Sequence, residues 1–267
     1  MDKLKLIAID IDGTLLNDEK EVSLENREAI RRAEAKGIYV ILATGRMYRS
    51  AKKLGNLFTT ELPFISYNGG LIREFNDGKI LMQKDMPKEM ARPIFTNLKK
   101  YGLSTNFYID DHLFGDEGNN NIKGYAEYIE VPYKIMKDEE IFKHIDAMDI
   151  MKMVAMGDEK DIDIFLANER EHFSSNLHLV KSLPFMLEIA NKEVNKGNAL
   201  AKLGEILGIK ASEMMAIGDN MNDEEMLDYV ANPFVMANGN ELLLKKNYMR
   251  TRSNNQDGVA YAISQFL

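Results

Sequence analysis

The sequence contains no cysteine, which excludes disulfides, thiolate metal sites and cysteine nucleophiles. It also has no apolar run near the ~20 residues that a membrane-spanning helix requires, and its first residues do not form a signal-peptide pattern. No Lys/Arg-rich run occurs and the formal net charge is −8, which argues against a nucleic-acid-binding surface. The four histidines lack metal-ligand spacing. We therefore expect a cytoplasmic protein with no nucleic-acid or membrane partner, and its oligomeric state remains open.

The overall composition is that of a globular protein. The chain has 267 residues, of which 45% are hydrophobic and 28% are charged. This length supports a full hydrophobic core and predicts one large domain or two smaller ones. No internal repeat and no low-complexity tract interrupts the chain.

The first acidic pair follows a short apolar segment near the start of the chain. Leu6 to Ile9 form an uninterrupted apolar run, which is typical of a strand buried on both faces of a parallel sheet. Asp10 and Asp12 come next, and strand periodicity places them on one side. Two such carboxylates repel each other by roughly 4 kcal/mol at about 4 Å, so a hard divalent cation is a natural partner. A turn with two solvated aspartates is the alternative interpretation.

A second candidate site follows the apolar run 38–43. Thr44 and Gly45 end this predicted strand, and a helix to about Phe58 is expected to begin at Thr44-Gly45-Arg46. A hydroxyl, a close backbone N–H and a helix N-terminus together would form a small anion site. The same residues also fit a common structural turn.

Two further candidate segments lie near the end of the chain. Lys196 opens a predicted helix that ends near Gly208, where a surface lysine is the simpler interpretation. The apolar run 214–217 predicts a strand, and it is followed by carboxylates and amides that include Asp219, Asn222 and Asp223. This segment could equally be an Asx-rich turn that caps the next helix.

The pattern of elements divides the chain into a core and an insert. Residues 1–83 and 188–267 alternate strands and helices, which predicts an α/β fold with a parallel sheet. A β-hairpin is expected at 71–74 and 79–83. Residues 84–187 read instead as an α+β module, with helices expected near 88–101, 120–129, 138–147 and 159–172 and strands near 104–109, 150–156, 177–182 and 185–190. Within it, Asp110-Asp111-His112 is interpreted as an exposed loop.

The four polar segments, in this order, resemble the motifs of the haloacid dehalogenase superfamily of phosphotransferases. The matching residues are Asp10-Ile11-Asp12-Gly13-Thr14, Ala43-Thr44-Gly45-Arg46, Lys196-Gly197-Asn198-Ala199 and Gly218-Asp219-Asn220-Met221-Asn222-Asp223. The position of the insert is similar to that of the large type-IIB cap in Cof-type phosphatases. The resemblance spans the whole chain and implies a Rossmann-like core with a cap that determines substrate specificity.

The resemblance also implies a role for each candidate residue. It makes Asp10 the nucleophile, which forms an aspartyl-phosphate, and Asp12 the general acid and base. It implies that Mg²⁺ lies between the Asp10 carboxylate, the Asp12 backbone carbonyl and Asp219. The other implied contacts are with phosphate for Thr44, Gly45, Lys196 and Asn222, and with Lys196 or metal-bound water for Asp223. The implied substrates are small phosphorylated metabolites such as sugar phosphates.

Two other functions remain possible at this point. A phosphosugar mutase of the same superfamily would have a similar layout and a related cap. A phosphoacceptor signalling domain also has Asp, Thr and Lys at parallel strand ends, but it is shorter and lacks both the second aspartate and the insert. A non-catalytic binding protein is disfavoured because no motif position is degraded.

Overall fold

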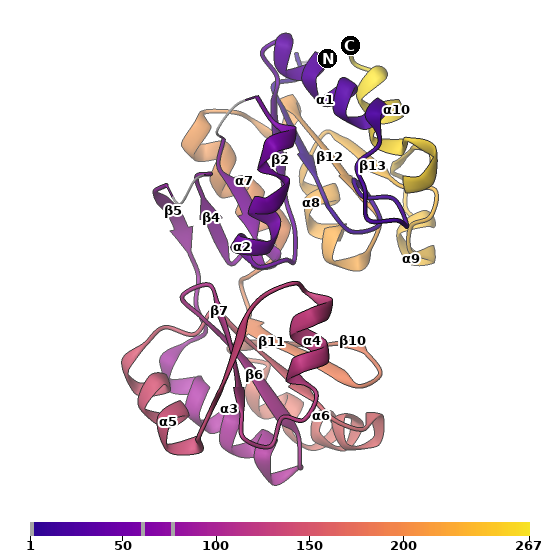
Figure 1. The fold of residues 1–267 in the computed structure, drawn as a ribbon. Coiled ribbons are helices and arrows are strands. Elements are labelled where there is room, and N and C mark those ends of the chain that lie inside the picture. Colours follow the sequence, from indigo (N-terminus) through magenta and orange to yellow (C-terminus); the bar gives the residue numbers. More distant parts are fainter. Residues whose placement is uncertain (1–2, 60–61, 76–77) are drawn as a thin grey trace. The chain divides into compact units, whose positions relative to one another are not determined.

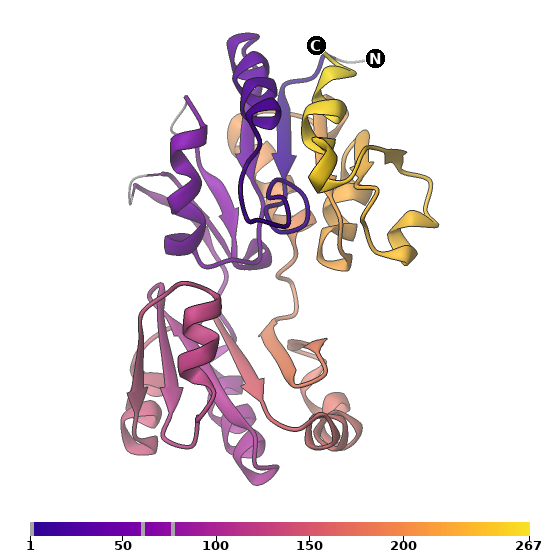
Figure 2. The same ribbon diagram turned by 45° about the vertical axis from the view of Figure 1, so that its right-hand side comes forward.

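The computed structural model describes residues 3–59, 62–75 and 78–267, and its chain forms two compact units (Figures 1 and 2). The first unit comprises the described residues of Met1–Gln83 together with Asn195–Leu267, and the second comprises Lys84–Val194. The second boundary therefore falls after Val194 and not after residue 187. The reason is that Met186–Asn191 form strand β11, which pairs with β9 (Lys152–Met156) inside the insert.

A five-stranded parallel sheet forms the centre of the first unit, as the sequence predicts. Its order is β14-β13-β12-β1-β2. The strands are β1 (Leu6–Ile9), β2 (Tyr39–Leu42), β12 (Met214–Gly218), β13 (Asn232–Val235) and β14 (Met249–Arg250). β1 lies between β12 and β2, and all four of its residues are buried. Its carboxyl end therefore lies next to that of β12.

Helices cover the parallel sheet. They are α1 (Leu24–Ala35), α2 (Tyr48–Ala51), α7 (Lys196–Leu207), α8 (Glu224–Tyr229), α9 (Glu241–Leu244) and α10 (Gly258–Ser264). Leu6 and Ala8 of β1 share one apolar cluster with residues of α7 and α8, so these two helices cover the same face. α1 and α10 lie side by side in both views. The Ser23 side chain caps α1 by accepting a hydrogen bond from the Asn26 N–H.

The segment after β2 differs from its prediction. No helix begins at residues 44–46: α2 starts at Tyr48, and a 3₁₀ helix, Lys52–Leu57, continues it. The carbonyl oxygens of Thr44 and Arg46 accept hydrogen bonds from the N–H groups of Asn68 and Tyr67. These carbonyls are therefore taken by another segment, and the helix starts only beyond them.

A small antiparallel sheet follows, with order β3-β4-β5. Its strands are β3 (Phe64–Ser66), β4 (Leu71–Arg73) and β5 (Ile80–Gln83), and a parallel bridge from Ala43 to Ile65 joins β3 to the end of β2. The predicted hairpin is confirmed as the β4–β5 pair. Residues 76 and 77 of its expected turn lie outside the described residues.

The second unit contains a six-stranded mixed sheet of order β10-β11-β9-β6-β7-β8. Besides β9 and β11 its strands are β6 (Ser104–Ile109), β7 (His112–Asp116), β8 (Tyr133–Met136) and β10 (Leu177–Leu183). The helices are α3 (Lys88–Lys100), α4 (Ile122–Tyr128), α5 (Asp138–Ala147) and α6 (Glu159–Phe173). Apolar residues of α3, α5 and α6 pack on one face of the sheet. The α+β prediction for the insert agrees with these elements, except that β7 and β8 were not expected.

The Asp110-Asp111-His112 segment, expected as an exposed loop, lies at the tip of a hairpin, where Asp110 and His112 are exposed. Asp110 and Asp111 form the two-residue turn of the β6–β7 hairpin, with φ of 47° and 55°, and His112 is the first residue of β7.

No helix in the described part of the chain is long and apolar enough to cross a membrane.

Candidate active site

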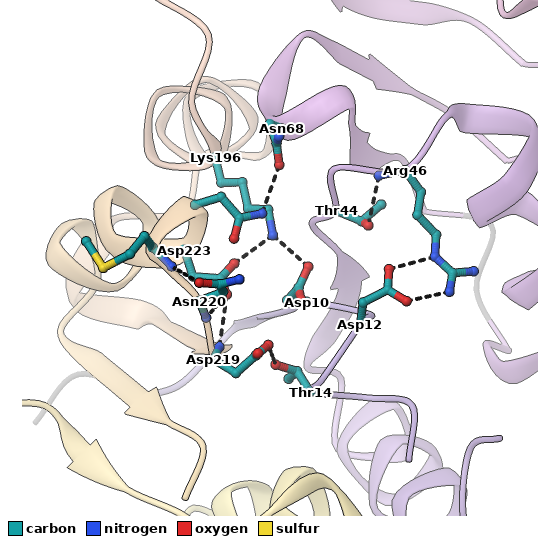
Figure 3. A network of polar contacts seen from close by, with 12 residues as sticks. Asp10, Asp12, Thr14, Thr44, Arg46, Asn68, Lys196, Asp219, Asn220 and Asp223 are labelled. Carbon is teal, nitrogen blue, oxygen red and sulfur yellow. Dashed lines mark hydrogen bonds and ion pairs between the residues drawn. The ribbon is translucent and has the colours of Figure 1, made fainter. Parts of the chain in front are cut away.

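The candidate residues gather at the carboxyl ends of β1 and β12 (Figure 3). Asp10 directly follows β1 and Asp219 directly follows β12. These two strands are neighbours in a parallel register, so the two carboxylates meet at one edge of the sheet. This is the edge at which open α/β sheets bind ligands.

Lys196 joins two of the carboxylates. Its Nζ lies 2.6 Å from Asp10 Oδ1 and 2.6 Å from Asp223 Oδ1. The Lys196 side chain is fully buried, and Asp10 is 5% exposed. Burial lowers the pKa of Lys196, but the adjacent Asp10 and Asp223 carboxylates outweigh it and raise that pKa overall. The surface-charge interpretation of Lys196 is therefore wrong.

Asp223 also fixes the loop that carries Asp219. Its Oδ2 accepts hydrogen bonds from the Asp219 N–H at 2.9 Å and the Asn220 N–H at 3.1 Å. The residue is fully buried. The Asp223 carboxylate thus holds both the Lys196 side chain and the backbone after β12. The segment therefore does more than cap the next helix.

Three carboxylates form a group that could hold a metal ion. One oxygen from each of Asp10, Asp219 and Asp223 lies within 4.8 Å of the others. Burial, followed by the Asp223 charge, raises the pKa of Asp219 to about 6, although the Thr14 hydroxyl donates to it at 2.7 Å. Burial likewise raises the pKa of Asp10, against the opposing effect of Lys196. A divalent cation with oxygen ligands would relieve this excess of negative charge, so the donor set fits Mg²⁺.

Asp12 is separated from this group. Arg46 binds it with two hydrogen bonds, from Nε to Oδ2 at 2.7 Å and from Nη2 to Oδ1 at 2.5 Å. The Asp12 side chain is 60% exposed. β1 ends at Ile9, so strand alternation does not continue through this turn. The two aspartates consequently have different partners, a fully buried lysine for Asp10 and a partly buried arginine for Asp12.

Gly45 and Asn222 lie against the side chain of Asn68, and the Thr44 carbonyl accepts a hydrogen bond from the Asn68 N–H. The Thr44 hydroxyl accepts a hydrogen bond from the Arg46 N–H at 3.1 Å. Asn222 Nδ2 donates to Asn68 Oδ1 at 3.0 Å. A Cβ at Gly45 would lie 2.7 Å from the same oxygen, so any other residue there would displace the Asn68 amide. Asn68 therefore contacts both predicted phosphate-binding segments.

The sequence matches the family model of haloacid dehalogenase-like hydrolases over residues 7–263. The chain belongs to this family. It is accordingly a hydrolase with the parallel-sheet fold of the family, and the relatives named as phosphatases make it an enzyme of the phosphatase type.

Similar proteins agree with this family assignment. A Streptococcus pyogenes protein with a provisional phosphatase name is 34% identical over 99% of this chain and 98% of its own length. A Bacillus subtilis protein named 5-amino-6-(5-phospho-D-ribitylamino)uracil phosphatase is 30% identical over 99% of this chain and 98% of its own length. The crystal structure of a Thermotoga maritima protein has 30% identity and a TM-score of 0.89, and the match covers 98% of this chain and 97% of that one.

Two residues of this candidate site, Arg46 and Asn68, had no role predicted from the sequence. Arg46 stands inside a recognised motif, but nothing in the sequence indicates that it pairs with Asp12. Asn68-Gly69 predicts a turn, because Asn-Gly pairs favour left-handed conformations, but it gives no signal of a contact with Asn222. Tyr67 gives no signal of a turn, yet Tyr67, Asn68 and Gly69 all have positive φ, of 54°, 55° and 101°. For the two non-glycine residues this conformation costs on the order of 1–3 kcal/mol each.

Proposed function

We propose that this hydrolase is a Mg²⁺-dependent phosphatase that cleaves small phosphomonoesters, sugar phosphates or similar metabolites, through an aspartyl-phosphate. The observation that carries the proposal is the buried Asp10–Lys196–Asp223 network beside Asp219. A carboxylate nucleophile that attacks an anionic phosphate needs positive charge close by. Here that charge is held at 2.6 Å from the nucleophile.

In this mechanism Asp10 attacks phosphorus and the ester oxygen leaves. Lys196, the Thr44 hydroxyl, the Gly45 N–H and Asn222 bind the phosphoryl oxygens and orient the group for in-line attack. Asp223 keeps Lys196 in place. Because the lysine is fully buried, its charge acts in a region of low dielectric, where it is more effective than in water.

Asp12 is assigned the proton transfers. It protonates the leaving oxygen and later removes a proton from the water that hydrolyses the aspartyl-phosphate. Its partial exposure supports this role, since a residue that meets both leaving group and water must be accessible. Arg46 occupies both oxygens of the ionised carboxylate and must release one when Asp12 carries the proton.

The proposed Mg²⁺ ligands are the carboxylates of Asp10 and Asp219 and the backbone carbonyl of Asp12. When bound, the ion would neutralise charge on the phosphoryl oxygens and on the clustered carboxylates. Asp223 lies in the same group but is engaged by Lys196 and by two backbone N–H groups. We therefore assign it a positioning role.

The proposed substrate class rests on the relatives. The Bacillus subtilis protein at 30% identity is named for a phosphorylated ribityl compound, a small phosphomonoester with a hydroxylated carbon chain. Such a leaving group is a poor one and requires an acid, which is consistent with the role given to Asp12.

The test is the turnover of an aryl phosphate and of a panel of sugar phosphates by the purified protein. We expect phosphate release with Mg²⁺, loss of turnover in EDTA, and recovery when Mg²⁺ is restored. Full activity in excess chelator would contradict the metal assignment. Isomerised sugar phosphate in place of free phosphate would identify a mutase instead.

A further inference from the structure

The turn Tyr67–Gly70 touches three of the segments that surround the proposed phosphoryl site, although no role has yet been given to it. The Asn68 and Tyr67 N–H groups donate to the carbonyls of Thr44 and Arg46. On another side Gly69 approaches the start of α7 so closely that a Cβ there would lie 2.2 Å from the Asn195 carbonyl oxygen. Lys196 is the next residue. The turn is thus packed between the Thr44 segment and the helix that carries the buried lysine.

The Asn68 side chain adds the contact with Asn222. Asn222 is exposed and follows the loop after β12, and its Nδ2 donates to Asn68 Oδ1 at 3.0 Å. An exposed side chain without such a contact would sample several rotamers. The Asn68 amide also lies against Gly45, whose missing Cβ leaves room for it. One amide therefore sets both the orientation of Asn222 and its distance from the Thr44–Gly45 segment.

The backbone of the turn is held in a conformation that most residues avoid. Asn68 has φ of 55° and ψ of 28°, in the left-handed region that asparagine and glycine tolerate best. Tyr67, which is 3% exposed, shares this region although a bulky side chain disfavours it. Strained residues of this kind persist where surrounding contacts over-determine them, and they cluster at functional sites.

We propose that Asn68 is a positioning residue of the phosphoryl site: it holds the Asn222 amide beside Thr44 and Gly45 so that the three bind the phosphoryl group together. This inference rests on the proposed function and adds a residue to it. Because the phosphoryl group is common to all substrates, removal of the Asn68 amide lowers kcat/KM for every substrate by the same factor. Asn68 acts through Asn222 and performs no proton transfer.

The test begins with Asn68→Gly, which deletes the amide but keeps a residue that adopts positive φ freely. We expect kcat/KM to fall about 10- to 100-fold, as for other residues that orient a ligand-binding side chain. The fall should be equal for an aryl phosphate and a sugar phosphate. Binding of inorganic phosphate in the presence of Mg²⁺, measured by calorimetry, should weaken in parallel, with no loss in the thermal unfolding midpoint. Glu130→Gly is the matched control, because Glu130 also has positive φ (56°) but lies just after α4 in the insert.

A double-mutant cycle with Asn222→Ala separates positioning from a general structural effect. If Asn68 acts through Asn222, the double variant loses no more activity than Asn222→Ala alone. Wild-type kinetics and phosphate affinity in Asn68→Gly would overturn the inference, as would a loss that differs between leaving groups or one that multiplies in the double variant. A wild-type protein without phosphatase activity would contradict the proposed function instead, while the phosphate-binding comparison would still test Asn68.

Discussion

At the scale of single residues, the two aspartates after β1 differ in what they contact. Asp10 is buried against Lys196, whereas Asp12 is half-exposed against Arg46. We expect Asp10→Asn to abolish turnover of every substrate, because it removes the proposed nucleophile. Asp12→Asn should retain a burst of phenol from an aryl phosphate with an acidic phenol, since that leaving group needs little protonation. With a sugar phosphate no burst should occur, because the missing acid contributes roughly 10²–10⁴-fold.

Rapid-quench kinetics with both substrates measures this division of roles. In Asp12→Asn, aspartyl-phosphate should accumulate after the burst, because the base that activates water is absent. A burst from Asp10→Asn, or an equal slowing of the first step for both substrates in Asp12→Asn, would show that the roles are assigned wrongly.

A second residue-scale prediction concerns Asp116 in the insert. Asp116 is 3% exposed, and among the described residues its Oδ1 has no hydrogen-bond partner. Burial raises its pKa from 3.8 to about 6, against the opposing effects of the Thr105 N–H and Lys99. The folded state therefore favours the protonated form. The protonated Asp116 therefore contributes fully to the stability of the folded state below about pH 4, and this contribution is lost as the pH rises through about 6.

Asp116→Asn should accordingly stabilise the protein at pH 7.5 and not at pH 4. The amide has no charge to desolvate, and its oxygen can still accept from the Thr105 N–H. A shift from 3.8 to about 6 corresponds to at most about 3 kcal/mol, and we expect a gain of about 1–3 kcal/mol in the free energy of unfolding. Urea denaturation at the two pH values measures it, with Asp146→Asn, in an exposed pair with Arg92, as the control. An equal gain at both pH values would refute the assigned pKa.

At the scale of elements, the turn that ends β1 determines where the carboxylates lie. Gly13 has φ of +79°, and a Cβ on it would lie 2.5 Å from Asp219 Oδ2. Gly37 has nearly the same φ (+78°), but a Cβ there would meet nothing within 4 Å. Both glycines thus have a left-handed backbone conformation that disfavours other residues. Only at Gly13 would a side chain also collide with a neighbouring residue.

We expect Gly13→Ala and Gly37→Ala to share a destabilisation of about 1–2 kcal/mol from the left-handed backbone. Only Gly13→Ala should also displace Asp219, and a displacement of about 1 Å can cost on the order of 10²-fold in rate. Steady-state kinetics and thermal denaturation of both variants measure these effects. Normal activity in Gly13→Ala would mean that the Asp219 position is not critical.

Periodicity and capping explain which elements were predictable. β1, β2 and β12 are continuous apolar runs, and α1 and α7 have an asparagine or serine cap and a glycine at or just beyond the end. The helix after β2 was misplaced because its first carbonyls bind the N–H groups of Tyr67 and Asn68, a contact between segments that no local pattern reveals. β8 was missed because three of its four residues are exposed, so it lacks the apolar signal of a buried strand.

Contacts between distant segments also limited what could be predicted of the candidate site. The motifs and their spacing identified the candidate residues Asp10, Asp12, Thr44, Gly45, Lys196, Asp219, Asn222 and Asp223. The resemblance implied that Asp223 contacts Lys196 or metal-bound water, and the structure shows the contact with Lys196. Spacing could not show that Lys196 also pairs with Asp10, because these two residues are far apart in the chain and meet only through sheet order. Arg46 and Asn68 were missed for the same reason: their importance comes from partners on other elements.

At the scale of the whole molecule, the two units have separate hydrophobic cores. One apolar cluster runs from Leu6 to Leu243 within the first unit, and another lies entirely between Met86 and Ile189 within the second. The polar network around Asp10 and Lys196 draws only on residues of the first unit. Each unit can therefore keep its own core, and the proposed catalytic groups do not depend on the insert for their mutual geometry.

We expect a variant that lacks residues 84–194, with Gln83 joined to Asn195 by a short flexible linker, to fold and to retain weak phosphatase activity. If the insert selects the leaving group, kcat/KM for sugar phosphates should fall far more than for an aryl phosphate, and the spread among sugar phosphates should narrow. The measurement is kcat/KM over the same substrate panel for the variant and the full chain, with Asp10→Asn in the shortened chain as the background control. A shortened enzyme that still discriminated among sugar phosphates as the full chain does would place specificity in the first unit.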